Sequence, residues 1–326
     1  MKETISIKDI KGIRIGQTED PEGGTGCTVF LSEAGMAAGM DVRGGGPASR
    51  ESELLKPLAA AQEIHAIVLA GGSAFGLGAA DGVMQYLEER GIGFDVGVTK
   101  VPLVCQSDLF DLTAGDPGVR PDRAMGYEAC LRAEEENYRD GNYGAGCGAT
   151  VGKFAGMDYC MKSGIGSCAL QVGELQVGAV VAVNALGDIY DWRSGQKLAG
   201  LLAEDRRSFR RTEDLMYADT RTVENKFTGN TTIGVVITNA DFQKASLCKI
   251  AGMAQDGYAR SIRPVHTTAD GDSIYAVSVR DAEGKKVSAD QDLVGTLAAE
   301  VMSEAITAAV KSARSAYGLP AWEDIS

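Results

Sequence analysis

Short apolar runs separated by glycines fill the N-terminal third of the chain and predict a series of strands. Such runs stand at 12–16, 25–31 and 35–47, each short enough for one strand between glycine turns. A further apolar run at 65–70 also predicts a strand. Over 74–90 the apolar residues recur at helical spacing, so we expect a helix directly after that strand.

The middle of the chain has a different pattern. Residues 144–191 combine β-branched side chains, alternation and glycine-centred turns, which predicts consecutive antiparallel strands. Residues 193–230 are strongly polar, and we expect a short helix followed by an exposed linker. The polar character stops at 231–238, TTIGVVIT, a continuous apolar and β-branched run that is typical of a buried central strand.

The C-terminal part predicts two helices on either side of one strand. Asp241 is a good N-cap for the first helix, 272–280 has the composition of a strand, and 291–316 predicts a long amphipathic helix. Because strands and helices segregate more than they alternate after residue 144, we expect an α+β fold in which helices cover layered sheets.

Composition narrows the range of functions. The 326 residues, 44% of them hydrophobic, are enough for one large domain or two ordinary ones. A net charge of −13 without any basic stretch argues against nucleic-acid partners. Seven scattered cysteines without a CxxC pair, together with only two histidines, indicate a reducing cytoplasm and no metal cluster. Neither an apolar signal core nor a run of about 18 apolar residues is present, so we expect no membrane partner.

The junction between Asn230 and Thr231 joins a polar linker to the first residue of an apolar strand. If that bond is cut, Thr231 becomes a chain terminus that the strand holds rigidly. Its Oγ is a nucleophile, and its own α-amine, with an unperturbed pKa of about 7.7–8.0, can act as the general base. Such a site needs no catalytic histidine. On spacing alone, however, a threonine that opens a strand is usually only a good β-former.

Sequence motifs provide a second, independent indication. The segment GNTTIGVVITNA at 229–240 resembles the cleavage segment of the L-aminopeptidase/D-esterase family, which includes β-peptidyl aminopeptidases and the nylon-oligomer hydrolase. Other stretches between residues 12 and 312 resemble this family in the same order: TGCTVFL, MDVRGGGPASRE, IVLAGGSAFGLGAADGV, FDL, NYGAGCGATVGK, VGAVVAVNALGD and HTTADGDSIYAVS.

The resemblance implies a four-layer αββα sandwich of the N-terminal-nucleophile hydrolase type. It implies a single hydrolase domain, 1–326, that cuts itself into an α-chain of residues 1–230 and a β-chain of residues 231–326. The expected activity is that of an aminopeptidase or amidohydrolase, which releases N-terminal residues from short peptides, amides or esters. β-Peptides and aminohexanoate oligomers belong to the substrate range of the family. The resemblance also implies a homo-oligomer, a tetramer or larger. Because the sequence contains no cluster of metal ligands, we expect it to need neither a metal nor a cofactor.

Four further residues correspond in position to functional residues of that family. Lys153 would favour the deprotonated form of the nucleophile and keep the α-amine neutral. Asn184 would donate a hydrogen bond to a developing oxyanion. Asp270 and Asp272 lie two residues apart, so an extended backbone would point both to one face. There, one carboxylate would keep Lys153 charged and the other would orient the Thr231 amine. Without the resemblance, an ordinary surface or turn residue is the favoured interpretation of each of them.

The alternative function from a different class is a dinucleotide-binding protein that uses the glycine-rich turn at 71–82. Gly76, Gly78 and Gly82 follow a strand and lead into a helix, and Asp95 stands 19 residues after Gly76. This is near the dinucleotide-binding pattern, but the first glycine comes late and Asp81 occupies the third glycine position. We therefore favour close packing of strand and helix as the reason for these glycines.

Two other functional interpretations have weaker support in the sequence. Ser73 in the strand-to-helix turn, with His266 and Asp270 as partners, suggests a serine hydrolase, yet the elbow pattern G-x-S-x-G is incomplete. Cys147 in GAGCG suggests a reactive thiol, but no neighbouring histidine supports it. A binding protein that never cleaves itself is a further alternative.

Overall fold

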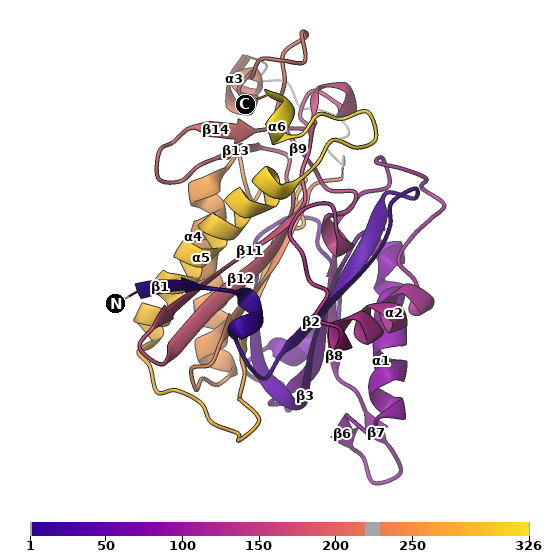
Figure 1. Cartoon of the computed structure of the whole chain (residues 1–326), viewed down its shortest axis with the longest axis vertical. Helices are drawn as coiled ribbons and strands as arrows, with labels where there is room; N and C mark the ends of the chain where they lie inside the picture. Colours follow the sequence, from indigo (N-terminus) through magenta and orange to yellow (C-terminus); the bar gives the residue numbers. More distant parts are fainter. Residues whose placement is uncertain (1, 219–228, 326) are drawn as a thin grey trace.

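The computed structural model describes residues 2–218 and 229–325 of the chain. Its centre is a large mixed sheet with the strands β1 (Lys2–Ile5), β2 (Arg14–Asp20), β3 (Thr25–Val42), β4 (Ala48–Arg50), β5 (Ile64–Ala70), β8 (Val104–Asp108), β11 (Ile165–Val172), β12 (Leu175–Asn184), β15 (Thr231–Thr238) and β17 (Ser273–Ser278). In space they follow the order β1, β11, β12, β15, β17, β3, β5, β8 and β4, and β2 pairs with β3 (Figure 1).

Strand β3 links the two halves of this sheet. Its first part pairs with β2 and β5, and its last six residues pair with β17. The sequence pattern predicted separate strands at 25–31 and 35–47, and this prediction was wrong. Gly35, at φ +78°, lies where the register between β3 and β5 shifts, so the glycine bends one long strand and does not end it.

Four long helices cover the two halves of the sheet. Helices α4 (Lys244–Ser261) and α5 (Gln291–Ser312) pack on the half that contains β11 and β12. Helices α1 (Ala79–Glu89) and α2 (Arg123–Glu134) pack on the half that contains β2 and β5 (Figure 1).

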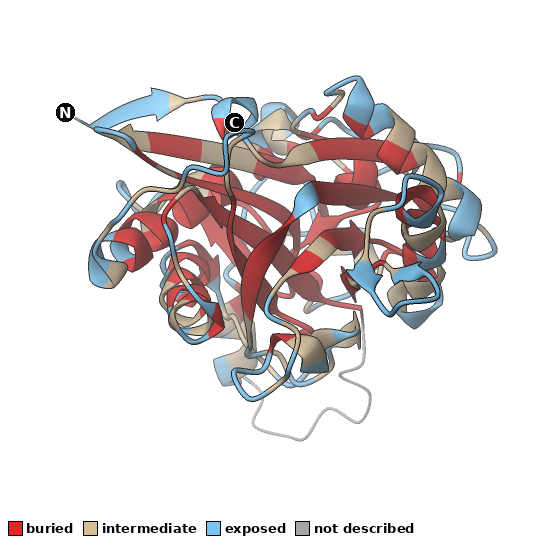
Figure 2. Ribbon diagram, turned by 90° about the horizontal axis from the view of Figure 1, so that it is seen from below, coloured by how far each residue is buried: buried red, intermediate tan, exposed pale blue. Residues whose placement is uncertain are grey.

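Each helix pair and its sheet half enclose an apolar cluster, and a third cluster lies where the two halves face each other. The central strands are therefore buried on both faces (Figure 2).

Strand β15 lies near the middle of the sheet, and all eight of its residues are buried. It pairs antiparallel with β12 and parallel with β17. The sequence prediction of a buried central strand at 231–238 is confirmed. Strand β12 pairs with β15 from Thr231 to Thr238, and β17 pairs with it from Ile233 onward, so the first residue of β15 is held in position by β12.

The antiparallel strands expected within 144–191 are confirmed in part. Strands β11 and β12 form a hairpin with eight paired residues on each side. The rest of this region leaves the large sheet: β9 (Thr150–Val151) pairs with β10 (Met161–Lys162), and β13 (Asp188–Tyr190) pairs with β14 (Lys197–Ala199) and β16 (Ile262–Arg263). A small hairpin with two residues in each strand, β6 (Phe94–Asp95) and β7 (Lys100–Val101), protrudes beside α1.

Two helix starts differ from the sequence prediction. The segment Ser73–Gly78 forms a 3-10 turn, so the α-helix expected from residue 74 begins only at Ala79. Helix α4 begins at Lys244 after Gln243, and Asp241 is not its N-cap. The backbone of Asp241 instead donates to the Val287 carbonyl at 2.8 Å, which keeps this residue outside the helix.

The polar segment before β15 contains the expected short helix, α3 (Thr212–Ala218), and residues 219–228 of the expected linker lie outside the described residues. The end of this segment is not exposed as predicted. Gly229 is buried, and Asn230 is only 2% exposed. The chain thus enters the protein interior two residues before the strand begins.

The C-terminal segment contains the expected long helix and one short helix. Helix α5 is long and apolar enough to cross a membrane, but 72% of its most apolar stretch is buried in the protein. Helix α6 (Trp322–Ile325) follows and packs near the end of α5.

Candidate active site

Thr231 is the first residue of β15, and its side chain lies against the bond that joins it to Asn230. The Oγ1 hydroxyl donates a short hydrogen bond to the Asn230 carbonyl oxygen, and Thr231 is only 5% exposed. The Gly271 backbone N–H donates to the same carbonyl oxygen at 3.1 Å. A nucleophile, a carbonyl group and a hydrogen-bond donor to its oxygen therefore meet at this bond, which is the minimal set for acyl transfer.

Lys153 lies in the loop after β9 and is buried with 5% exposure. Its Nζ donates to the Gly229 carbonyl at 2.7 Å, to the Asn184 side-chain oxygen at 2.8 Å and to the Asn184 carbonyl at 3.0 Å. Three acceptors match the three donors of an ammonium group. Burial opposes the charge and lowers the pKa of Lys153 to about 7. Both protonation states are therefore accessible near neutral pH.

Asn184 ends β12 and stands directly opposite Thr231 in the ladder between β12 and β15. Its Nδ2 donates to the carbonyls of Phe110 at 2.9 Å and Gly229 at 3.0 Å. Its Oδ1 accepts from Lys153 and from the Thr150 backbone N–H at 3.0 Å. The amide is therefore fixed at every atom, with its donor side directed toward the chain that precedes the nucleophile.

The two aspartates do not meet Lys153 in the predicted way. Asp272 accepts at Oδ1 from the Thr232 backbone N–H at 2.8 Å. Asp270 accepts from the backbone and side chain of Thr267, within its own loop. Among the described residues, neither carboxylate forms an ion pair with Lys153, because carbonyl and amide oxygens occupy all three of its donors.

Asp270 nevertheless belongs to the electrostatics of the site. Burial, followed by the charge of Asp272, raises the pKa of Asp270 to about 6. Lys153 acts in the opposite direction on this pKa, so these groups are close enough to influence one another. Asp270 and Asp272 therefore lie near one another and near Lys153, while direct contact with Lys153 is absent from the described part.

Two glycines contribute to the site although the sequence analysis assigned them no role. Gly229, at φ +50°, brings its carbonyl to Lys153 and Asn184, and a Cβ there would lie 2.0 Å from the Phe110 ring. A Cβ on Gly271 would lie 2.7 Å from Thr231 Oγ1. Gly229 belongs to the motif GNTT and Gly271 to the motif TADGDS. The sequence motifs therefore included both glycines, but they did not show which contacts the glycines make.

The alternative functions find less support in the structure. A Cβ on Gly76 would lie 2.0 Å from the Gly71 carbonyl, and one on Gly82 would lie 1.9 Å from the Arg123 carbonyl. Close packing thus accounts for Gly76 and Gly82, whereas a Cβ on Gly78 would meet no atom within 4 Å. Asp95 lies on the small exposed hairpin. Two of the three glycines of the dinucleotide-binding pattern are therefore explained without a nucleotide.

The contacts of His266 and Cys147 argue against a serine hydrolase and against a reactive thiol. The ring of His266 bonds to Asp272, and no hydrogen bond in the described part joins it to Ser73 or Asp270. Cys147 is buried, and burial raises the pKa of its thiol above the usual value. A thiol held in its protonated form is a poor nucleophile.

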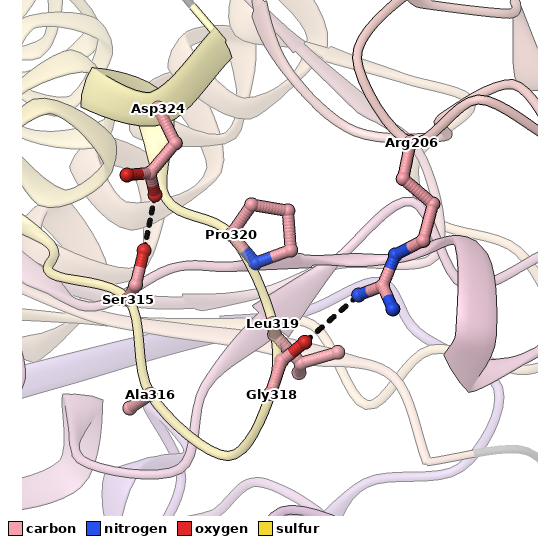
Figure 3. Close-up of a pocket in the computed structure, with 7 residues that line it drawn as sticks. All are labelled: Arg206, Ser315, Ala316, Gly318, Leu319, Pro320 and Asp324. Carbon is pink, nitrogen blue, oxygen red and sulfur yellow. Dashed lines mark hydrogen bonds between the residues drawn. The ribbon is translucent and has the colours of Figure 1, made fainter.

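A pocket of about 430 Å³ lies elsewhere, between the C-terminal segment and the loop before α3 (Figure 3). Arg206 crosses it and donates to the Gly318 carbonyl at 2.8 Å. Its described lining contains none of the five residues expected in catalysis.

Sequence comparison places the chain among known peptidases. The profile of peptidase family S58 matches residues 6–321. An uncharacterized aminopeptidase of Mycobacterium leprae is 37% identical over 97% of this chain and 93% of its own length. A 6-aminohexanoate-oligomer endohydrolase of a Kocuria species is 30% identical over 95% of this chain and 87% of its own length.

The fold agrees with solved structures of related enzymes. One of them is an L-aminopeptidase D-Ala-esterase/amidase from Ochrobactrum anthropi, which is described as a variant of the Ntn hydrolase fold. The match covers 94% of this chain and 86% of that enzyme, with a TM-score of 0.69 at 17% identity. A Burkholderia β-aminopeptidase has a TM-score of 0.66 at 20% identity, again over 94% of this chain and 86% of the enzyme. The fold is thus Ntn hydrolase-like, with a large mixed sheet between helices, and the chain belongs to peptidase family S58, a family of hydrolases with aminopeptidase members.

Proposed function

We propose that this protein cuts its own chain between Asn230 and Thr231 and then uses Thr231 to hydrolyse amide bonds at the N-terminus of small substrates. The contact of Thr231 Oγ1 with the carbonyl oxygen of Asn230 carries the proposal, because it places a hydroxyl at the bond to be cut. The Gly271 N–H, 3.1 Å from that oxygen, supplies a donor for the developing negative charge.

Self-cleavage begins with an acyl shift. Thr231 Oγ attacks the Asn230 carbonyl carbon, the hydroxyl proton passes to a base, and the amide nitrogen leaves with a proton as the free α-amine. Water then hydrolyses the ester, which releases the Asn230 carboxylate and regenerates the hydroxyl. Lys153 is the proposed base because it is buried beside the chain that precedes Thr231, where its Nζ lies 2.7 Å from the Gly229 carbonyl, and because its lowered pKa of about 7 makes the neutral amine accessible.

Cleavage would change the roles of the surrounding donors. In the intact chain, Lys153 and Asn184 both donate to the Gly229 carbonyl, which belongs to the chain before the cut. Once that chain end moves away, both donors become free for the carbonyl oxygen of a substrate. The new α-amine of Thr231 then takes over as general base.

The substrate class that we propose is a short peptide, amide or ester from which the N-terminal residue is released. Relatives that act on 6-aminohexanoate oligomers, and a structural relative that is a β-aminopeptidase, extend this class to β-peptides and aminohexanoate oligomers. We further propose one hydrolase domain over 1–326, with the four-layer αββα arrangement divided after residue 230.

Intact-mass spectrometry with N-terminal sequencing tests this proposal directly. The purified protein is expected to contain two chains, and the second is expected to begin with Thr231. Thr231→Ala should remain one chain of 34.1 kDa and be inactive toward aminoacyl amides. Thr231→Ser is the matched control, because it retains the hydroxyl and should still cleave. Persistent cleavage at the same bond in Thr231→Ala would refute the assignment of the nucleophile.

A further inference from the structure

His266 is bound to Asp272 by two hydrogen bonds. Its backbone N–H lies 3.1 Å from Asp272 Oδ2, and its ring Nδ1 lies 3.0 Å from the same oxygen. The other oxygen of Asp272 accepts from the Thr232 N–H at 2.8 Å. A carboxylate that is 1% exposed thus connects the histidine to the residue that follows the nucleophile.

The direction of the ring contact follows from its partners. An ionised carboxylate only accepts hydrogen bonds, so the proton between His266 and Asp272 belongs to Nδ1. The other ring nitrogen, Nε2, is buried and has no hydrogen-bond partner among the described residues. A proton on Nε2 would therefore be unsatisfied in the interior. The contact with the carboxylate therefore places a hydrogen on Nδ1.

The backbone of His266 adopts a costly conformation to make this contact. Its φ of +59° lies in the left-handed region, which residues other than glycine rarely occupy. Strain of this kind persists only where surrounding contacts enforce it. Here both donors of the residue converge on one carboxylate oxygen, which is a sufficient reason for the strained turn.

The contact matters most for a chain that has been cut. Before cleavage, Thr231 is held on both sides by the polypeptide. Afterwards its nitrogen is a free end, and the peptide plane between Thr231 and Thr232 must fix its orientation. Asp272 holds the N–H of that plane at 2.8 Å. The ladder with Asn184 supports the same end from the other side.

We propose that His266 is a positioning residue for the nucleophile. It fixes Asp272 by its Nδ1 hydrogen, and Asp272 in turn fixes the peptide plane next to Thr231, so that the hydroxyl and the new α-amine keep their catalytic geometry. This inference rests on the proposed function of Thr231, but the hydrogen-bond chain from His266 to Thr232 exists independently of that function.

Two substitutions separate the ring contact from the backbone conformation. His266→Gly keeps the backbone N–H and accommodates the positive φ without strain, so it removes only the ring. His266→Asn also tolerates this φ, and its side-chain amide can donate from about the position of Nδ1. If the turn alone mattered, His266→Gly would equal the wild type.

We expect self-cleaved His266→Gly protein to lose about tenfold to a hundredfold in kcat with little change in KM, because a misplaced nucleophile affects the reaction more than binding. His266→Asn should recover most of that loss, and both variants should unfold near the wild-type temperature. Wild-type kcat in His266→Gly would overturn the proposal, as would an equal loss in both variants.

A measurement without turnover keeps this inference distinct from the proposed function. The chain has only two histidines, and His65 accepts a hydrogen bond from the Leu103 N–H at its Nδ1, at 3.1 Å. Nitrogen NMR of histidine-labelled protein should therefore show opposite tautomers, with the hydrogen on Nδ1 in His266 and on Nε2 in His65. His65→Gln assigns the signals.

The outcomes are distinguishable. A His266 ring that carries its hydrogen on Nε2 and none on Nδ1 would refute the positioning contact even if the enzyme is active. Asp272→Ala should disturb the His266 signal and leave that of His65 unchanged, and an undisturbed His266 signal in this variant would also refute the contact. An inactive, uncut wild type with the expected tautomers would refute the proposed function but not the hydrogen-bond chain.

Discussion

Two buried lysines, Lys153 and Lys162, stand nine residues apart and share nearly every property that a search for catalytic residues would use. Both are buried, and for both burial lowers the pKa to about 7. Each Nζ donates to three oxygen atoms of the protein. By burial and pKa alone, the two residues are indistinguishable.

Their partners differ. Lys162 donates to the carbonyls of Gly146 and Ala149, both at 3.1 Å, and to that of Ser163, so that it ties together the backbone around its own strand. Lys153 donates instead to a residue at the end of β12 and to the carbonyl just before the proposed cleavage site, far away in sequence.

This difference shows that a lowered pKa marks a buried group and does not by itself mark a functional one. What separates the two lysines is whether their acceptors belong to a permanent part of the fold or to a segment that the reaction would remove. Lys162 stabilises a loop in every state of the protein. Lys153 would lose one partner on cleavage and gain a free donor.

The largest effect is expected for Lys153→Met. Without the base for the acyl shift, self-cleavage should stop or become very slow, and little activity of any kind should remain. Gel electrophoresis and intact mass would show one chain, while thermal unfolding should stay cooperative. Normal processing of this variant would remove the distinction between the two lysines.

The next largest effect is expected for Asn184→Ala. We expect turnover of small amides to fall by about 10²–10³, the usual loss for an oxyanion donor. Self-cleavage should be slowed less, because the scissile carbonyl accepts from the Gly271 N–H. Rates of both processes in the same preparation provide the test. An equal loss in both would mean that Asn184 serves the intact chain as well.

A smaller effect is expected from pH. The fraction of Lys153 in the neutral amine form increases as the pH rises through about 7. The rate of self-cleavage of uncut precursor should therefore rise by about tenfold per pH unit below that value and level off above it. Because Lys162 titrates in the same range, Lys162→Met provides the control, and its profile should keep the same inflection. Loss of the inflection in Lys162→Met would show that the inflection belongs to Lys162 and not to Lys153.

The smallest effect on activity is expected for Lys162→Met itself. The substitution leaves buried carbonyls without their donor, which should lower the free energy of unfolding by about 1–3 kcal/mol. Denaturant titration measures this loss. At low temperature, cleavage and turnover should remain near the wild-type level, and a specific loss of turnover would make Lys162 part of the site.

The sequence pattern predicted the strand of the nucleophile well. An unbroken apolar run at 231–238 can be recognised in the sequence because burial on both faces of the strand requires apolar side chains along it. The family motifs also selected Lys153, Asn184 and Thr231, which the structure brings together around Gly229 and Asn230.

The contacts of the aspartates could not be predicted in the same way. Their carboxylates are directed by a loop in which His266 has a positive φ, and no periodicity encodes such a turn. Similarly, glycine content alone does not distinguish Gly35, which bends β3, from a glycine that would end a strand. Such details depend on partners that are distant in sequence.

The strand order has a consequence for the product of the proposed cut. Strands β15 and β17 follow residue 230, yet they lie between β12 and β3, which both precede it. The two polypeptides would therefore be interleaved within one sheet, with the pair β15 and β17 held on both sides by strands of the longer polypeptide. Separating them would require the sheet to unfold, so the cleaved protein would behave as a permanent heterodimer whose dissociation and denaturation are the same event.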